Sequence, residues 1–137
     1  MKDVLLTGVA MVVIAAGAPA VASSPVTGVW QTPPDRKDLV SHIRVAHCGD
    51  DGKALCGKVL RAYNSDGELV ETPNIGKRIF WGVEPLGDGE YGNGTAWVPL
   101  LNVNASANLT LSDSGDTLKV RGCKAILCDS QMWRRVK

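Results

Sequence analysis

The chain has few aromatic residues, few histidines and no excess of charge of either sign. Its 137 residues include one Phe, two Tyr and two His, and 15 Lys and Arg stand against 14 Asp and Glu. The net charge of +1 is far from the strongly basic balance with which nucleic-acid-binding proteins neutralise phosphates, so we expect no nucleic-acid partner. Any histidine-dependent chemistry must use His42 or His47.

Motifs of known catalytic centres are also missing. The nucleophile pattern G-x-S-x-G does not occur. Residues 87–92 match G-x-G-x-x-G, but a dinucleotide site needs a helix after the motif, and a Pro-containing strand is predicted there instead. We therefore interpret this segment as a glycine-rich hairpin loop and expect a binding protein without a cofactor. An enzyme that uses His42 or Glu90 is the less favoured alternative.

The N-terminal residues have the pattern of an export signal. Lys2 precedes the apolar run 4–16, and small residues at 18, 20 and 22 form overlapping cleavage sites. The alternative, a retained membrane anchor, is disfavoured because the run is shorter than the roughly 20 apolar residues that span a bilayer. We predict a signal peptide over residues 1–22 and one domain over 23–137, without a membrane span, in the periplasm or secreted.

Four cysteines remain in that mature chain, and they allow three disulfide pairings. Cys48 and Cys56 flank a turn-rich segment, and Cys123 and Cys128 flank another short one, so the spacing favours two disulfides that each clamp a hairpin. A four-cysteine zinc site is the alternative. It usually has closer ligand spacing, and export to an oxidising compartment favours disulfides, so we expect no metal.

Short segments of alternating apolar and polar residues recur after Ser23, with no helical periodicity. In 104–111 and 117–122 the alternation predicts a hairpin with one wet face. Segments 69–74 and 87–92 are predicted loops, and Pro99 places its strand at an edge or a bulge. About eight strands fit an all-β fold, a single antiparallel up-and-down barrel. The predicted strands cover 27–31, 39–46, 55–63, 78–83, 94–101, 104–111, 117–122 and 127–136.

Four tryptophans, each on a different predicted strand, are the most informative side chains. The simpler interpretation is that most of them fill the barrel. The alternative is that some line a cavity for a small apolar ligand, because Gln131, Trp133 and Arg135 share one strand face and a polar pair is unusual in a dry core. The candidate lining is Trp81, Trp97, Trp133, Gln131 and Arg135. His42 is predicted to lie with Arg44 on a solvated face.

Three sequence blocks resemble a known bacterial family. They are Gly28-Val29-Trp30, the Cys48-Gly49 to Leu55-Cys56-Gly57-Lys58-Val59 segment, and the end from Gly122-Cys123 to Trp133-Arg134-Arg135. They are similar to the domain-of-unknown-function family 2147 over nearly the whole mature chain. The resemblance implies an exported, lipocalin-like barrel with paired cysteines and no agreed activity. By analogy of architecture it implies binding of a small apolar molecule or envelope component. A packed protein-interaction module of the envelope is the alternative, and a hydrolase is less favoured.

Overall fold

This computed structural model describes Gly8 and residues 24–137. The described part of the chain contains nine β-strands and no helix. Apart from Gly8, the predicted signal peptide lies outside it. No helix among the described residues is long and apolar enough to cross a membrane. The strands are β1 (Gly28–Gln31), β2 (Val40–Cys48), β3 (Ala54–Tyr63), β4 (Leu69–Val70), β5 (Arg78–Gly87), β6 (Glu90–Val98), β7 (Val103–Leu111), β8 (Thr117–Lys124) and β9 (Leu127–Arg135).

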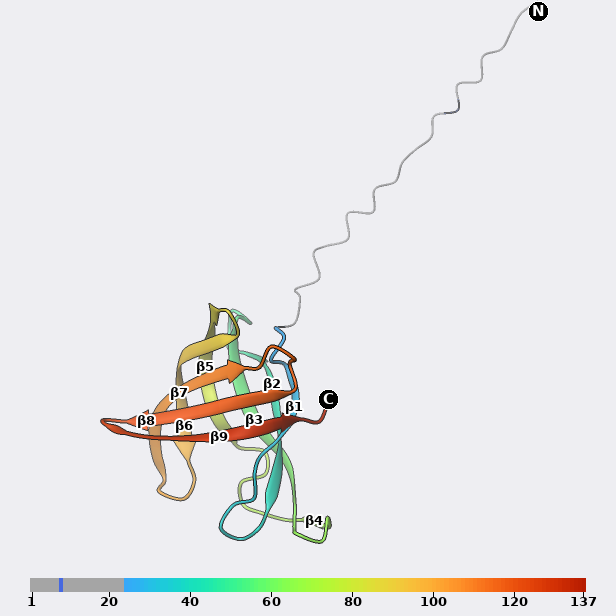
Figure 1. Cartoon of the computed structure of the whole chain (residues 1–137), viewed down its shortest axis with the longest axis vertical. Coiled ribbons are helices and arrows are strands. Elements are labelled where there is room, and N and C mark those ends of the chain that lie inside the picture. The colour runs from blue at the N-terminus through green and yellow to red at the C-terminus, as the bar shows by residue number, and fades with distance from the viewer. Residues whose placement is uncertain (1–7, 9–23) are drawn as a thin grey trace, which may run out of the picture.

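Eight of these strands close into an antiparallel barrel (Figure 1). The order around the barrel is β1, β2, β3, β5, β6, β7, β8 and β9, and β1 closes it by pairing with both β2 and β9. Only β4 stands outside, as a two-residue strand on the edge of β3. The predicted all-β barrel is therefore confirmed. Closure removes the unpaired sheet edges, and it puts one face of every strand inside.

Inward-facing side chains fill the barrel. The hairpin predicted at 104–122 is confirmed: Leu109 and Leu118 are buried, whereas Lys119 and Arg121 are exposed. Three large rings of the core are those of Trp30, Phe80 and Trp133, and the centroids of the last two lie 6.2 Å apart. The core residues are Val26, Trp30, Ile43, Val45, Leu55, Val59, Phe80, Val83, Tyr91, Ala107, Leu109, Leu118 and Trp133.

One close approach between neighbouring strands depends on a glycine. Gly57 on β3 pairs with Phe80 on β5, and the phenyl ring occupies the space where a side chain at 57 would begin. A β-carbon at Gly57 would lie within 3 Å of three ring atoms of Phe80. The ring therefore packs directly on the backbone of β3.

The structure corrects three details of the predicted strands. The glycine-rich segment is a loop only at Asp88–Gly89, because Glu90 already begins β6 and pairs with Thr110. Pro99 lies in the turn after β6 rather than on an edge or a bulge, since that strand starts and ends earlier than predicted. Residues 69–70 of the predicted loop form β4. Positive φ angles at Asp88 and Gly89 allow the sharp reversal that alternation alone does not reveal.

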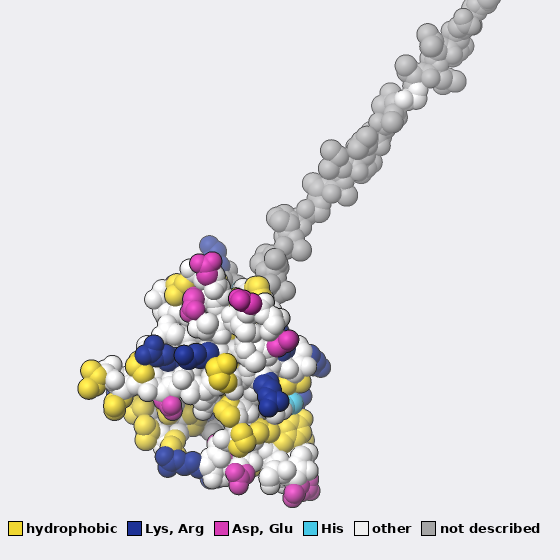
Figure 2. All heavy atoms as spheres, in the orientation of Figure 1, with side chains coloured by type: hydrophobic (Ala, Val, Ile, Leu, Met, Phe, Trp, Pro, Cys, Tyr) yellow, Lys and Arg dark blue, Asp and Glu magenta, His cyan; other side chains and the backbone are white. Residues whose placement is uncertain are grey.

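Both disulfides join the pairs that the spacing favoured. Cys48 and Cys56 link the end of β2 to the start of β3, with Cα atoms 5.8 Å apart. Cys123 and Cys128 are direct partners in the β8–β9 hairpin, with Cα atoms 4.1 Å apart. Beyond this second bridge the hairpin projects from the barrel, and hydrophobic side chains gather at its tip (Figure 2). Ile126, which is 95% exposed, belongs to this tip.

Candidate functional site

Two of the five predicted lining residues, Trp133 and Gln131, lie on the inner side of β9. Trp133 is buried in the core, and its indole N–H donates a hydrogen bond to Gln131 Oε1 over 3.0 Å. Gln131 itself is exposed. Their shared strand face is therefore confirmed, and the polar side chain beside Trp133 satisfies the indole N–H.

Arg135, the third, lies against the indole of the buried Trp30. Its guanidinium carbon is 4.3 Å from the centroid of the Trp30 ring, an attractive cation–π arrangement. The same guanidinium donates hydrogen bonds to the carbonyls of Gly115, Thr27 and Pro25 over 2.6 to 3.0 Å. Arg135 thus ties the segment before β1 to the β7–β8 turn, and three of its five N–H donors bond to the backbone.

Trp81 and Trp97 lie on the opposite, outer side of the barrel wall. Phe80 and Ala96 are cross-strand partners on the inner face, so Trp81 and Trp97, each one position further along, face outward. Both are partly exposed. Trp97 donates to Asn102 Oδ1 over 3.0 Å, and Lys77 lies over its ring. The five residues therefore divide between the two faces of the barrel.

A hollow with a volume of about 610 Å³ lies on the surface where β1, β2 and β3 run out of the barrel. We call it the loop-end hollow. Figure 1 shows the β1–β2 and β3–β4 connections together at that end, beside β4. Its volume lies within the roughly 300 to 1,000 Å³ of small-molecule sites. It is lined by Gln31, Pro34, Asp38, Val40, His42, Tyr63, Asn64, Ser65 and Gly67, and thus by none of the five predicted residues.

The strand register places this hollow on the outer face of the sheet. Gln31 is opposite His42, and Val40 is opposite Tyr63, so these four side chains share one face. Trp30, the neighbour of Gln31, points the other way into the core. The sequence contained the turn signals of this end of the barrel, but it gave no sign that the turns enclose a hollow, because that depends on how two separate connections fold back over β2.

His42 is buried, which corrects the expectation of a solvated side chain. It pairs with Arg61 of β3, whereas Ile43 pairs with Val59, so Leu60 is an extra residue in β3. Such a bulge bends its strand and increases the local twist. The imidazole lies 4.9 Å from the Tyr63 ring, centroid to centroid. The alternation of residues along β2 does not reveal a one-residue bulge in its partner strand β3.

Electrostatics at this histidine favour its neutral form. Burial lowers the pKa of His42 below 6.5, and the nearby Arg61 guanidinium lowers it further. Because Gln31 Oε1 can only accept, His42 Nε2 carries the proton and donates to it over 3.2 Å. His42 Nδ1 is then a buried acceptor, and it has no hydrogen-bond partner. A buried titratable ring with an unpaired atom, in the wall of a hollow, is an arrangement more typical of functional sites than of cores.

We expect the depressed pKa of His42 to make stability fall in mild acid. Unfolded His42 takes up a proton near pH 6.5 and the folded form only at lower pH, so protonation favours unfolding once the pH drops below 6.5. Urea unfolding between pH 8 and pH 5.5 measures this, with the wild type losing more stability than His42→Gln. The matched control is His47→Gln, which retains the His42 contribution. Parallel curves for wild type and His42→Gln would contradict the prediction.

Groups of three or more metal-ligating side chains do not occur among the described residues. Besides the Asp38 carboxylate, the lining of the loop-end hollow offers ring, amide and hydroxyl groups. These can hold a molecule by apolar contact and hydrogen bonds.

Comparison with known proteins shows which class of fold the barrel belongs to. The fold resembles that of a solved structure, protein HP1028 from Helicobacter pylori, described as belonging to the lipocalin family. The TM-score is 0.62 at 13% identity, over 82% of this chain and 83% of that one. At this identity the likeness shows a shared lipocalin-like barrel. A search of curated proteins found no match.

The family follows from the sequence match. A family model described as "Uncharacterized protein conserved in bacteria (DUF2147)" matches residues 28–135, so the chain belongs to that family. The resemblance drawn from the sequence blocks is thereby confirmed. Two disulfides in a protein of a bacterial family suggest an oxidising compartment outside the cytoplasm.

Proposed function

We propose that this protein is a non-enzymatic binding protein, exported to the periplasm or secreted, whose loop-end hollow takes up a small uncharged molecule. The observation that supports this proposal most is the hollow of about 610 Å³ with a buried, partly unsatisfied histidine in its wall. The barrel interior, in contrast, is occupied by the large rings of Trp30, Phe80 and Trp133.

The lining suggests the chemistry of the ligand. Pro34, Val40 and the Tyr63 ring offer apolar contact, and Gln31 and Asn64 offer hydrogen bonds. The lining contains the carboxylate of Asp38 and no lysine or arginine, which disfavours an anion. A molecule with an apolar ring and one hydrogen-bonding group matches these features better than the wholly apolar ligand expected from architecture alone.

Two measurements test the proposal. Native mass spectrometry of protein purified from its own export compartment should reveal a bound small molecule. Titration with phenol, benzyl alcohol and benzamide, followed by NMR, should move the backbone signals of Val40 and His42. Tyr63→Ala should weaken that binding about tenfold, because it removes the aromatic face, and Tyr63→Phe, the matched control, should preserve it. A purely apo mass together with no shifts at Val40 and His42 would refute binding here.

A further inference from the structure

Three cations form a row across three neighbouring strands on the outer face of the barrel. Arg44 on β2 is the direct cross-strand partner of Lys58 on β3, and Lys58 is the direct partner of Arg78 on β5. All three side chains are exposed. Like charges directly opposite one another in a sheet are destabilising, so this row opposes folding unless an anion neutralises it.

The row borders the second, smaller hollow. This hollow has a volume of about 140 Å³ and is lined by Arg44, Ala46, His47, Cys48, Cys56, Lys58 and Arg78, with no carboxylate among them. A space of this size is too small for a whole drug-sized ligand, for which about 300 Å³ or more is usual, but it suits one charged group.

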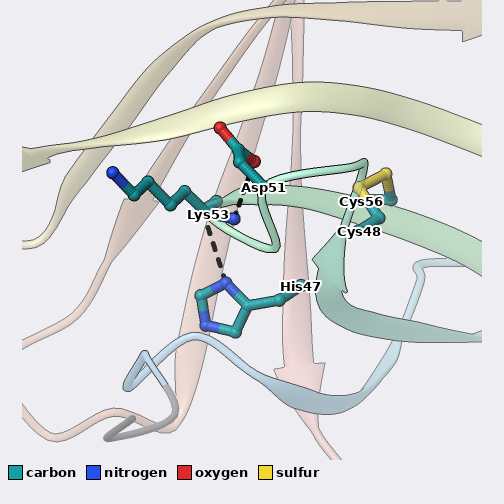
Figure 3. The surroundings of a disulfide bond; sticks show 5 residues. All are labelled: His47, Cys48, Asp51, Lys53 and Cys56. Carbon is teal, nitrogen blue, oxygen red and sulfur yellow. Dashed lines mark hydrogen bonds between the residues drawn. A yellow bond between two sulfur atoms is a disulfide. The ribbon is translucent and has the colours of Figure 1, made fainter.

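The two cysteines of the first disulfide are part of the lining of this smaller hollow. Figure 3 shows Cys48 and Cys56 joined beside His47, whose ring faces the turn that carries Asp51 and Lys53. His47 Nδ1 lies 3.4 Å from the Lys53 carbonyl, and Asp51 Oδ1 accepts a hydrogen bond from the Lys53 amide. The Asp51 carboxylate is therefore engaged in shaping its own turn.

We propose that Arg44, Lys58 and Arg78 form a binding site for a phosphate group, separate from the loop-end hollow. Two guanidinium groups and one ammonium group are the side chains best suited to a tetrahedral oxyanion, because guanidinium donors match its oxygens in pairs. The group can belong to a soluble phosphate ester or to a phospholipid headgroup, since the recognised chemistry is the same.

Inorganic phosphate tests the site directly. At low ionic strength it should raise the melting temperature of the wild type more than chloride does at equal ionic strength. Lys58→Gln should melt higher than the wild type without phosphate, because it relieves the repulsion, and should bind phosphate about tenfold more weakly. Lys119→Gln is the matched control: Lys119 is an exposed strand lysine whose cross-strand partners are Thr110 and Met132, so neither quantity should change.

Vesicles distinguish the two sources of the phosphate. A lipid headgroup would be supported if the wild type sediments with phosphatidylglycerol vesicles but not with phosphatidylcholine vesicles. Lys58→Gln should then abolish the sedimentation. A phosphate-dependent shift without vesicle binding would support a soluble ester. The proposal is wrong if phosphate and chloride give the wild type the same melting temperature, or if Lys58→Gln retains the full phosphate-dependent shift.

Discussion

Trp30→Ala is expected to lower the free energy of unfolding by about 3 to 5 kcal/mol, the range for a large aromatic side chain removed from a core. Trp30 is fully buried, and its indole N–H donates to the Val26 carbonyl over 2.9 Å. The substitution leaves a cavity beside β1 and leaves that buried carbonyl unpaired. It also takes away the ring against which Arg135 lies. Because β1 is the strand that closes the barrel between β2 and β9, the loss affects the whole fold.

Urea unfolding followed by circular dichroism measures this effect. Trp97→Ala is the matched control, because Trp97 is partly exposed on the outer face of β6 and its indole bonds only to the exposed Asn102 side chain. We expect the control to lose less than half as much stability as Trp30→Ala. Equal losses in the two variants would contradict the assignment of Trp30 to the core and of Trp97 to the surface.

Gly57→Ala is also expected to have a large effect, and to lower the free energy of unfolding by about 1 to 3 kcal/mol or more. The added β-carbon would lie 2.3 Å from an atom of the Phe80 ring, so either the ring or strand β3 must move. Neither can move freely, because Phe80 is buried against Trp133 and β3 is paired on both sides. Overpacking, rather than backbone strain, is the physical cause.

A double substitution separates these causes. Gly57→Ala combined with Phe80→Leu should lose less stability than the sum of the two single variants, because the smaller side chain makes room for the new methyl group. Gly122→Ala is the matched control within a strand: a β-carbon there would meet the Ser106 carbonyl oxygen at 3.4 Å and should cost little. Additive losses in the double variant would show that the ring of Phe80 is not the obstacle.

The alternation of residues by itself determines much of the fold. In β7 and β8 the period of two identified both faces, so that the burial of Leu109 and Leu118 and the exposure of Lys119 follow from sequence. The close spacing of the cysteines favoured the two observed bridges, because each pair flanks a hairpin turn. These features are local: the residues that decide them lie within one hairpin.

Only the tertiary structure decided which side chains meet across the barrel. The five residues predicted to line one cavity divide between the inner and outer faces, because the strand register, and not residue type, sets the side of each tryptophan. His42 is buried beside Tyr63 at the point where the partner strand β3 carries a bulge. The row of Arg44, Lys58 and Arg78 spans residues 44 to 78 and exists only because pairing brings three strands together. Sequence thus determined the local alternation and the fold class, whereas long-range pairing decided where the hollows and their charges lie.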